Sequence, residues 1–416
     1  MRLFAATKTS TVMNTKKLTL IGIIFIFTCT HFSYSQEISS TRFGDGLLNI
    51  MGKDSTWSMK VGARMQLLSN FSWTDEGQNK FANPEQDFLV RRARLKFNGF
   101  AYSPKLKYKI ELGLSNRDMS GSSEFTGNTP RYILDAVVIW NFYQNFELWF
   151  GQTKLPGNIE RVISSGNLQQ VDRSLLNSRF NIDRDMGFQL RHHFYLGNRF
   201  LVREKFAFSQ GEGRNVTQGN LGGHQYTSRI ELLPFGNFIK KGDYRAADLN
   251  REQTPKLMFG TTYDINNNAV KTRSNMGSYM SNDIGFHETN IYTLFLDLMF
   301  KYRGFSLMGE FAHRDASEPV ALNPDNTPTG DVVQVGNGLN LQSGYLFKNN
   351  WEVSARFTNI ELDMEITGKN PQKQYTLGLS KYIVGHKLKV QTDLSYLNID
   401  NGLDELMYRL QVDVHF

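Results

Sequence analysis

The 416-residue chain has one cysteine and no apolar run long enough to form a membrane-spanning helix. Its longest apolar run covers residues 18–29, whereas a spanning helix needs ~20 apolar residues. Because Cys29 falls inside that run, the rest of the chain offers no disulfide framework and no thiol metal site. No basic run is interleaved with aromatic residues, so we expect no nucleic-acid partner. No nucleophile elbow or motif-level Ser–His–Asp combination is present, so we expect no enzyme, no cofactor and no metal site.

Residues 1–35 have the pattern of a cleaved secretory signal peptide. The basic pair Lys16-Lys17 precedes the apolar run, and small residues follow it at 33–35. We expect cleavage near Gln36, with Met13 as an alternative start. A lipid anchor on Cys29 is the competing interpretation, which the preceding residues disfavour. The segment carries four basic residues and no acidic one, so its removal lowers the formal net charge from +7 to +3.

What the chain has in abundance is strict alternation of apolar and polar residues. The last eleven residues place Leu406, Tyr408, Leu410, Val412, Val414 and Phe416 in alternation with Met407, Arg409, Gln411, Asp413 and His415. A period of two indicates a strand with one apolar face and one polar face. About sixteen such segments follow one another over 56–416. We therefore predict a single all-β domain: a transmembrane antiparallel β-barrel in an outer membrane.

The cost of placing charge in lipid predicts which face of each strand points inward. A Lys or Arg facing lipid at mid-bilayer costs ~2–4 kcal/mol, so the polar sets must line the lumen. On the inner faces of the first three strands this predicts a basic, pore-lining anion path, since only Glu111 is acidic there. The residues of this path are Lys60, Arg64, Arg92, Arg94, Lys96, Lys107 and Lys109. The alternative, which stays open, is that they only keep the lumen wet and pair with acids of the third loop.

The connections between the expected strands alternate between long and short. Odd-numbered strands are followed by long polar segments at 74–86, 117–130, 153–184, 211–223, 264–289, 314–331 and 359–373. Even-numbered strands are followed by tight turns, as expected for a barrel with long extracellular loops and short periplasmic turns. One segment, 234–255, is long yet falls on the short-turn side. Either the strand count slips there or the periplasmic face carries an extra element. Residues 36–55 are expected to form a short periplasmic lead-in.

Five stretches, taken in order, resemble the phosphate-selective porin O and P family. They are VGARMQ at 61–66, FLVRRARL at 88–95, DA at 135–136, GQTKLP at 151–156 followed by ER at 160–161, and RSL at 173–175 followed by RDMG at 184–187. The resemblance covers roughly 62–416. It implies a sixteen-stranded barrel, usually a trimer, whose third outer loop folds into the lumen. It also implies passive diffusion of anions or general solutes.

The segment 153–184 is the longest connection and occupies the third-loop position. By resemblance, its charged residues are candidates to shape the constriction of a pore. They are Lys154, Glu160, Arg161, Arg173, Arg179 and Arg184. The alternative for each is that it anchors the loop to the barrel wall through an ion pair.

Together these observations predict an outer-membrane porin for small hydrophilic solutes, with a mild preference for anions such as phosphate. As partners we expect outer-membrane lipids, lipopolysaccharide, small anions and two further copies of the chain in a homotrimer. A non-conducting structural or adhesive barrel, whose loops bind a partner, is the alternative. A phospholipase-type barrel enzyme is less favoured, because no Ser–His pattern lies near an aromatic girdle.

Overall fold

The computed structural model describes residues 36–39, 42–77, 80–119, 123–127, 130–218 and 220–416. The expected signal peptide, 1–35, lies outside the described residues. No helix among the described residues is long and apolar enough to cross a membrane.

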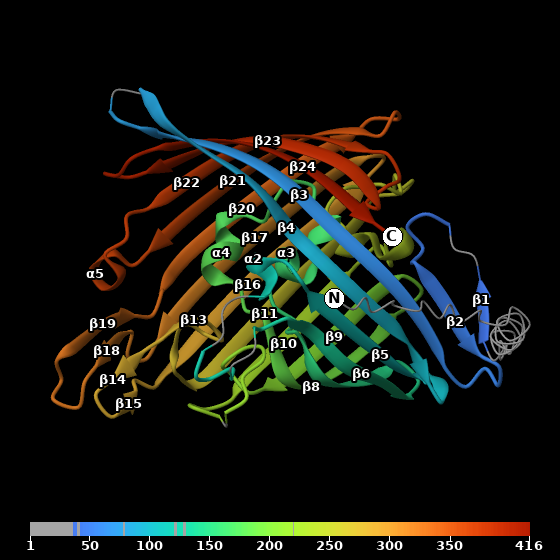
Figure 1. Cartoon of the computed structure of the whole chain (residues 1–416), viewed down its shortest axis with the longest axis horizontal. Helices are drawn as coiled ribbons and strands as arrows, with labels where there is room; N and C mark the ends of the chain where they lie inside the picture. The colour runs from blue at the N-terminus through green and yellow to red at the C-terminus, as the bar shows by residue number, and fades with distance from the viewer. Residues whose placement is uncertain (1–35, 40–41, 78–79, 120–122, 128–129, 219) are drawn as a thin grey trace, which may run out of the picture.

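Sixteen strands of the described residues form one closed antiparallel barrel (Figure 1). They are β3 (Ser58–Asp75), β4 (Phe81–Ala101), β5 (Ser103–Gly113), β6 (Ile133–Tyr143), β7 (Phe146–Lys154), β8 (Arg184–Leu196), β9 (Phe200–Ser209), β10 (Gln225–Leu233), β11 (Lys256–Ala269), β16 (Thr289–Tyr302), β17 (Phe305–Ala316), β20 (Gly336–Leu346), β21 (Trp351–Leu362), β22 (Gln372–Tyr382), β23 (Leu388–Ile399) and β24 (Glu405–His415). Each strand pairs with the next, and β24 closes the barrel on β3, where Thr74 lies opposite Glu405 and Arg64 opposite His415. Closure leaves no unpaired edge in the membrane, which lipid would not tolerate. The predicted fold is confirmed.

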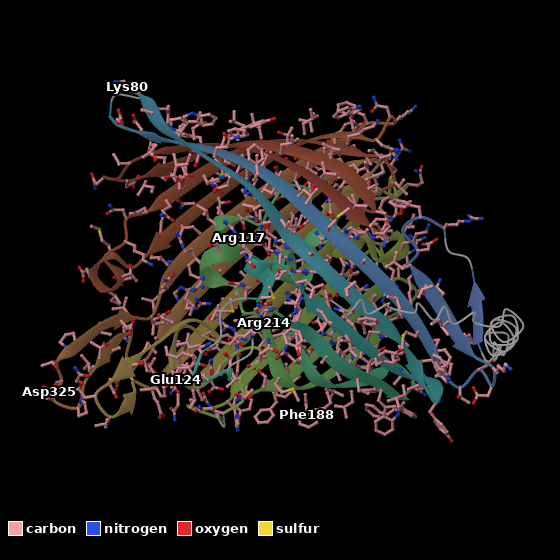
Figure 2. The ribbon with its side chains drawn as sticks, viewed as in Figure 1. Lys80, Arg117, Glu124, Phe188, Arg214 and Asp325 are labelled. Atoms are coloured by element: carbon pink, nitrogen blue, oxygen red, sulfur yellow. The ribbon has the colours of Figure 1, made fainter. Side chains whose placement is uncertain are left out.

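The barrel is apolar outside and polar inside, as the cost of charge in lipid predicts. In β24, Leu410 is 40% exposed on the outer wall, whereas Asp413 is fully buried on the inner one. In β23, Leu394 is 46% exposed and Lys389 is fully buried. Phe188 likewise projects from the outer wall (Figure 2).

The two ends of the barrel differ in the length of their connections. Turns of a few residues join β4 to β5, β6 to β7, β8 to β9, β16 to β17 and β20 to β21. The opposite end carries short helices and small hairpins: α2 (Asn116–Met119), β12 (Lys271–Arg273), β13 (Met276–Tyr279), β14 (Ser281–Asn282), β15 (Gly285–Phe286), β18 (Val320–Leu322), β19 (Pro328–Val332) and α5 (Met364–Thr367). Outer-membrane barrels have short periplasmic turns. We therefore call the short-turn end periplasmic and the other end extracellular.

The prediction of a long loop at 74–86 is wrong. β3 continues to Asp75 and β4 begins at Phe81, so the polar segment forms the tip of a long hairpin, marked by Lys80 in Figure 2. Beyond the membrane, polar composition does not end a strand when a neighbouring strand still supplies hydrogen-bond partners. Here Glu405 of β24 pairs with Thr74 on one side, and Ala82 pairs with it on the other.

The lead-in forms a small hairpin at the periplasmic end. β2 (Leu48–Gly52) pairs with the beginning of β3, and β1 (Gln36–Ser39) pairs with β2. This hairpin stands beside the barrel mouth at the right of Figure 1. A ring contact between Phe43 and Phe416, with centroids 5.9 Å apart, ties it to the C-terminal end of the chain.

Candidate functional site

The connection between β7 and β8 folds into the lumen, as predicted for the third loop. We call residues 155–183 the constriction loop. It contains α3 (Ile159–Val162), the 3-10 helix η1 (Ser165–Asn167) and α4 (Leu175–Phe180), which lie inside the barrel (Figure 1). Most of its side chains are buried, so it is a packed part of the interior.

An apolar patch on the inner wall holds α4. Phe180 and Leu176 pack with Phe295 and Ile360 in one buried cluster that also includes Ala207 and Ala312. These inward positions are apolar where most inward positions are polar, so the wall is built to receive the loop. The side chain of Ser174 caps α4 by accepting a hydrogen bond from the Asn177 amide at 3.2 Å.

Buried carboxylates of the barrel wall hold α3. The Ile159 amide donates to Asp297 at 3.1 Å, and the Glu160 amide donates to Glu310 at 2.7 Å. These N–H groups open a helix and have no partner within it. Two wall carboxylates therefore satisfy them and attract the positive end of the helix.

The middle of the constriction loop crosses the lumen. Gln169 donates to Glu352 at 2.6 Å and the Val171 amide to Asp393 at 3.1 Å. Asp172 then accepts from Arg91 at 2.5 Å and from Arg92 at 3.2 Å. Burial alone would raise the pKa of Asp172, but Arg92 and Arg91 hold it well below its usual range. The loop is thus fastened to the wall on both sides of the barrel.

An inner cavity of 720 Å³ lies on the periplasmic side of the constriction loop. Its lining includes the turn residues Gln144 and Asn145. An outer cavity of 460 Å³ lies on the extracellular side and is lined by loop residues such as Arg117 and Arg214, which Figure 2 labels. Strands β4 to β9 form much of the wall of the inner cavity, so this cavity lies along one side of the lumen.

Of the described residues, Arg94, Lys154 and Arg184 line both cavities. We call these three the eyelet, because each of them borders both cavities. Arg94 donates to both oxygens of Asp118 at 2.7 Å and to Glu111 at 3.0 Å. Arg184 donates to both oxygens of Asp135 at 3.2 Å. Two of the three cations are therefore neutralised by carboxylates.

Lys154 differs from the other eyelet residues. Its Nζ donates to the carbonyl oxygens of Arg161 at 2.6 Å, Ile163 at 3.2 Å and Val162 at 3.3 Å. No carboxylate of the described residues lies within 4.0 Å of this Nζ. The carbonyls hold the ammonium group in place, and it forms no direct ion pair with an acid of the described residues. Lysine is a compact point charge with three donors, which suits this arrangement.

The segment 234–255 also enters the lumen, from the periplasmic side. We call it the inward turn; it contains the 3-10 helix η2 (Ile239–Tyr244). Lys301 Nζ donates to the carbonyls of Gly242, Arg245 and Ala247 at 2.7–2.8 Å. The Ala246 amide donates to the Asn167 carbonyl of the constriction loop at 2.9 Å. β10 and β11 are neighbours, so the strand count does not slip: the segment is an extra element.

The sequence profile of the family described as phosphate-selective porin O and P matches residues 60–402. The chain belongs to this family. An uncharacterized protein of Aquifex aeolicus is 23% identical to this porin over 394 residues, covering 86% of this chain and 87% of that protein.

Solved structures share the porin's fold. The outer membrane channel DcaP of Acinetobacter baumannii has a TM-score of 0.52 at 12% identity and covers 88% of this chain and 99% of its own. OmpF of Salmonella typhi has a TM-score of 0.53 at 12% identity (87% and 99% covered), and the anion-selective porin of Comamonas acidovorans has 0.50 at 11% (86% and 100%). Family and fold place the protein in the outer membrane as a channel for small solutes, and point to a channel rather than an enzyme.

Within the porin, the residues of the predicted anion path divide into three groups. Arg92 and Arg94 line the outer cavity, and Arg94, Lys96 and Lys109 line the inner one. Arg64 lines neither and binds Asp413 at 3.1 Å and Ser165 of the constriction loop at 2.8 Å. Lys60 and Lys107 line neither cavity and have no ion pair among the described residues.

Ion pairs engage most of this set. Lys109 lies 2.8 Å from Asp135 and 3.3 Å from Glu111, while Lys96 lies 3.4 Å from Glu111. Of the third-loop acids, Asp172 pairs with Arg92. Pairing with a third-loop acid, the alternative stated above, therefore applies to Arg92. The other four paired residues, Arg64, Arg94, Lys96 and Lys109, bind acids outside that loop. Lys60 and Lys107 remain candidates on position alone.

The constriction-loop candidates also separate by position. Lys154 and Arg184 lie in the eyelet, and Arg161 and Arg173 line the outer cavity. Glu160 is buried and accepts from the Ser174 hydroxyl at 2.5 Å, so it holds the loop together. Arg179 lines neither cavity and donates to Gln372 of β22 at 3.2 Å.

Sequence reasoning missed several basic residues of the outer cavity. Strict alternation turns Arg91 outward, but a β-bulge makes Gln66 pair with Arg92 and Leu67 with Val90, so Arg91 is the extra residue and also reaches Asp172. The others lie on loops or loop hairpins, which carry no periodic signal: Arg117, Arg131, Arg214, Lys271 and Arg273. The inward turn did have a signal, namely its length on the short-turn side.

Proposed function

We propose that this porin lets small hydrophilic solutes diffuse passively and prefers anions mildly. One observation carries the proposal: of the described residues that line the outer cavity, twelve are Arg or Lys and three are Asp or Glu. The inner cavity has nine basic and four acidic lining residues. A passage lined mainly by one sign of charge lowers the energy of the opposite ion inside it.

The eyelet explains why the preference is mild. Arg94 and Arg184 form ion pairs with Asp118, Glu111 and Asp135. They therefore add little to the electrostatic potential of the lumen and act mainly through the space that their side chains occupy. Lys154 supplies the charge that an anion meets at the narrow passage. An anion is exchanged from the outer arginines to Lys154 and then to the basic residues of the inner cavity. No step requires chemistry or energy input.

The test is the reversal potential of the purified porin in a planar bilayer under a KCl gradient. We expect the reversal potential of the wild type to show anion selectivity. The reversal potential of Lys154→Gln should show a smaller anion-to-cation permeability ratio. One charge at 4 Å in water is worth about 1 kcal/mol, so the anion-to-cation permeability ratio falls about fivefold. Lys154→Arg should retain the selectivity. Lys348→Gln is the control, since Lys348 is an exposed residue of the turn between β20 and β21 and lines neither cavity. A cation-selective wild type would contradict the proposal.

A second candidate is a non-conducting barrel whose loops bind a partner. It is favoured by the constriction loop and the inward turn, which together fill much of the lumen opposite β4 to β9. Single-channel recording decides between the two, since discrete conductance steps would exclude a plugged barrel.

Export and assembly complete the proposal. From the pattern of basic, apolar and small residues we infer that residues 1–35 act as a cleaved signal peptide. From the family resemblance we infer that the porin works as a homotrimer, and we expect it to contact lipopolysaccharide. N-terminal sequencing of outer-membrane protein should begin near Gln36. Mild-detergent electrophoresis without heating should give a band at three times the mass of the heated chain.

A further inference from the structure

The inner cavity contains an aromatic side chain that ion passage does not need. Trp149 lies on the inner face of β7 and lines the cavity. The guanidinium carbon of Arg191, on β8, lies 3.6 Å from the centroid of its ring. The strand register produces this contact, since Trp149 pairs with Gln189 and Glu147 pairs with Arg191. Trp149 and Arg191 are therefore diagonal neighbours on one face of the sheet.

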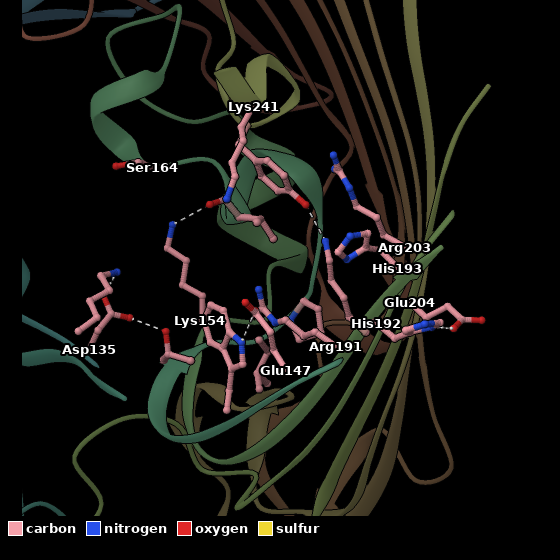
Figure 3. Close-up of a pocket in the computed structure, with 18 of the residues that line it drawn as sticks. Asp135, Glu147, Lys154, Ser164, Arg191, His192, His193, Arg203, Glu204 and Lys241 are labelled. Carbon is pink, nitrogen blue, oxygen red and sulfur yellow. Dashed lines mark hydrogen bonds and ion pairs between the residues drawn. The ribbon is translucent and has the colours of Figure 1, made fainter. Parts of the chain in front are cut away.

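Hydrogen bonds hold the Arg191 side chain in position, and its guanidinium group remains available to bind an anion. It donates to the side-chain oxygen of Gln189 at 2.6 and 3.3 Å. No carboxylate of the part of the chain that the structure describes lies within 4.0 Å of its guanidinium group. The nearby carboxylate of Glu147 accepts a hydrogen bond from the Trp149 indole at 3.0 Å. Arg191 is partly exposed, and Figure 3 shows it among the residues of the cavity.

The rest of the cavity suits a solute larger than an inorganic ion. Its 720 Å³ falls within the ~300–1,000 Å³ typical of sites for small organic molecules. Apolar side chains contribute to its wall beside the charged ones, namely Leu155, Pro156, Val162 and Leu201. Lys154 of the eyelet and Lys241 of the inward turn complete a basic surround (Figure 3).

We propose that the Trp149–Arg191 pair is a subsite, on the periplasmic side of the eyelet, for carboxylates that carry an aromatic ring. A guanidinium group binds a carboxylate through two parallel hydrogen bonds. An aromatic ring stacks against a tryptophan ring in an offset or edge-on geometry. The subsite rests on the proposed anion-preferring pore, since a solute that enters from the extracellular side must first pass Lys154.

The experiment measures block of the potassium chloride current through the full-length porin by three matched probes. Benzoate has both ring and charge, acetate has the charge alone, and benzamide has the ring alone. Benzoate should block at a concentration about 3- to 10-fold lower than either control, since an aromatic pair adds about 0.5–1.5 kcal/mol. Block should be stronger when the probe is added on the periplasmic side, where the cavity opens.

Variants separate the ring from the charge. Trp149→Leu should raise the blocking concentration of benzoate to that of acetate. Trp149→Phe should retain most of the difference between the two probes. Arg191→Gln should weaken the block by benzoate and the block by acetate to the same extent. The matched control is Trp140→Leu, because Trp140 lies on the adjacent strand β6, is 51% exposed on the outer wall and pairs with Leu148. Heat-modifiable migration confirms that each variant folds.

Two outcomes would overturn the subsite. One is a wild-type porin that benzoate and acetate block equally; the other is an equal loss of benzoate block in Trp140→Leu. If the reversal potential still shows anion selectivity in either case, only the subsite fails. If the wild type shows no anion selectivity at all, the proposed function fails first.

Discussion

At the scale of single residues, the partner of a charge decides what the charge does. Arg94, Arg184 and Lys154 stand at the same passage, yet only Lys154 has no acid beside it. A buried ion pair contributes little net field, whereas an uncompensated charge in a narrow passage contributes strongly. Counting basic residues along inward faces therefore overstates the anion path, because five of the seven predicted residues are paired.

Glu212 and Lys271 of the outer cavity give the selectivity a pH dependence. Burial, reinforced by Asp185, raises the pKa of Glu212 to about 7. Burial, reinforced by Arg131, lowers the pKa of Lys271 to about 8. As pH rises from 6 to 9, Glu212 gains a negative charge and Lys271 loses a positive one. Both changes reduce the positive charge of the outer cavity, so the anion-to-cation permeability ratio should fall over this interval.

The measurement is the reversal potential at fixed KCl gradient between pH 6 and 9. Glu212→Gln should remove the part of the change near pH 7 and leave the part near pH 8. Asp325→Asn is the control, since Asp325 lies at an exposed loop tip (Figure 2). A ratio that is constant with pH, or one that rises, would contradict the assignment.

The sequence predicted inward and outward positions well wherever strands are regular. Arg94 and Lys109 face the lumen because their apolar neighbours in sequence face lipid. Arg91 could not be predicted, since a bulge in β4 depends on the pairing with β3 and leaves no mark on the local pattern. Pairing with third-loop acids was an alternative from the sequence, but the specific pairs could not be predicted, because loop conformation is set by tertiary contacts. Asp118, which binds Arg94, lies on a different loop.

At the scale of elements, the lumen is shaped by two segments that meet inside it. The constriction loop arrives from the β7 end and the inward turn from the periplasmic mouth. They join where Ala246 donates to the Asn167 carbonyl and the Asn167 side chain donates to the Tyr244 carbonyl at 3.3 Å. Tyr244 and Lys241 thereby become part of the inner cavity wall. The inward turn is therefore a second determinant of pore size.

Lys301 is the anchor of the inward turn, and its removal should enlarge the pore. Lys301→Met leaves three carbonyls without a charged donor. Hydrogen bonds to charged groups contribute about 1.5–3 kcal/mol each, so the loss of all three lowers the local stability of the turn by roughly 4.5–9 kcal/mol. Single-channel conductance should rise and the open-channel current should become noisier.

Lys256→Met is the matched control for this change. Lys256 also donates to a carbonyl of the same segment, that of Phe235, but through one exposed contact at 2.7 Å. Its loss should leave conductance unchanged. An unaltered current in Lys301→Met, with the barrel intact, would mean that the turn does not narrow the pore.

The elements themselves were largely readable from sequence. Alternation identified the barrel strands, and connection lengths identified which ends are extracellular. The error at 74–86 arose because polar composition was taken as a loop signal, whereas β3 and β4 continue as a hairpin above the membrane. The path of the constriction loop depends on contacts with Phe295, Glu310 and Asp393, which are far from it in sequence.

At the scale of the whole molecule, the barrel has an asymmetric interior. The constriction loop packs on β16, β17 and β21, and the inner cavity follows β4 to β9. The basic residues of both cavities therefore act together along one side of the lumen. Closure of β24 on β3 fixes this arrangement, since Asp413 of β24 binds Arg64 of β3.

An interior field of this kind should respond to salt in two separable ways. The Debye length is about 10 Å at 0.1 M salt and about 3 Å at 1 M. Charges of the outer cavity away from the eyelet, such as the exposed Arg117, act at a distance and should lose their effect at 1 M KCl. Lys154 acts on an anion in contact with it, so its effect should persist.

We therefore expect Arg117→Gln to lower anion selectivity at 0.1 M only, and Lys154→Gln to lower it at both concentrations. Reversal potentials measured under gradients centred on these two concentrations give the comparison. If both variants lose their effect together at high salt, the eyelet contributes only a diffuse field, and direct contact between Lys154 and the permeating anion is wrong.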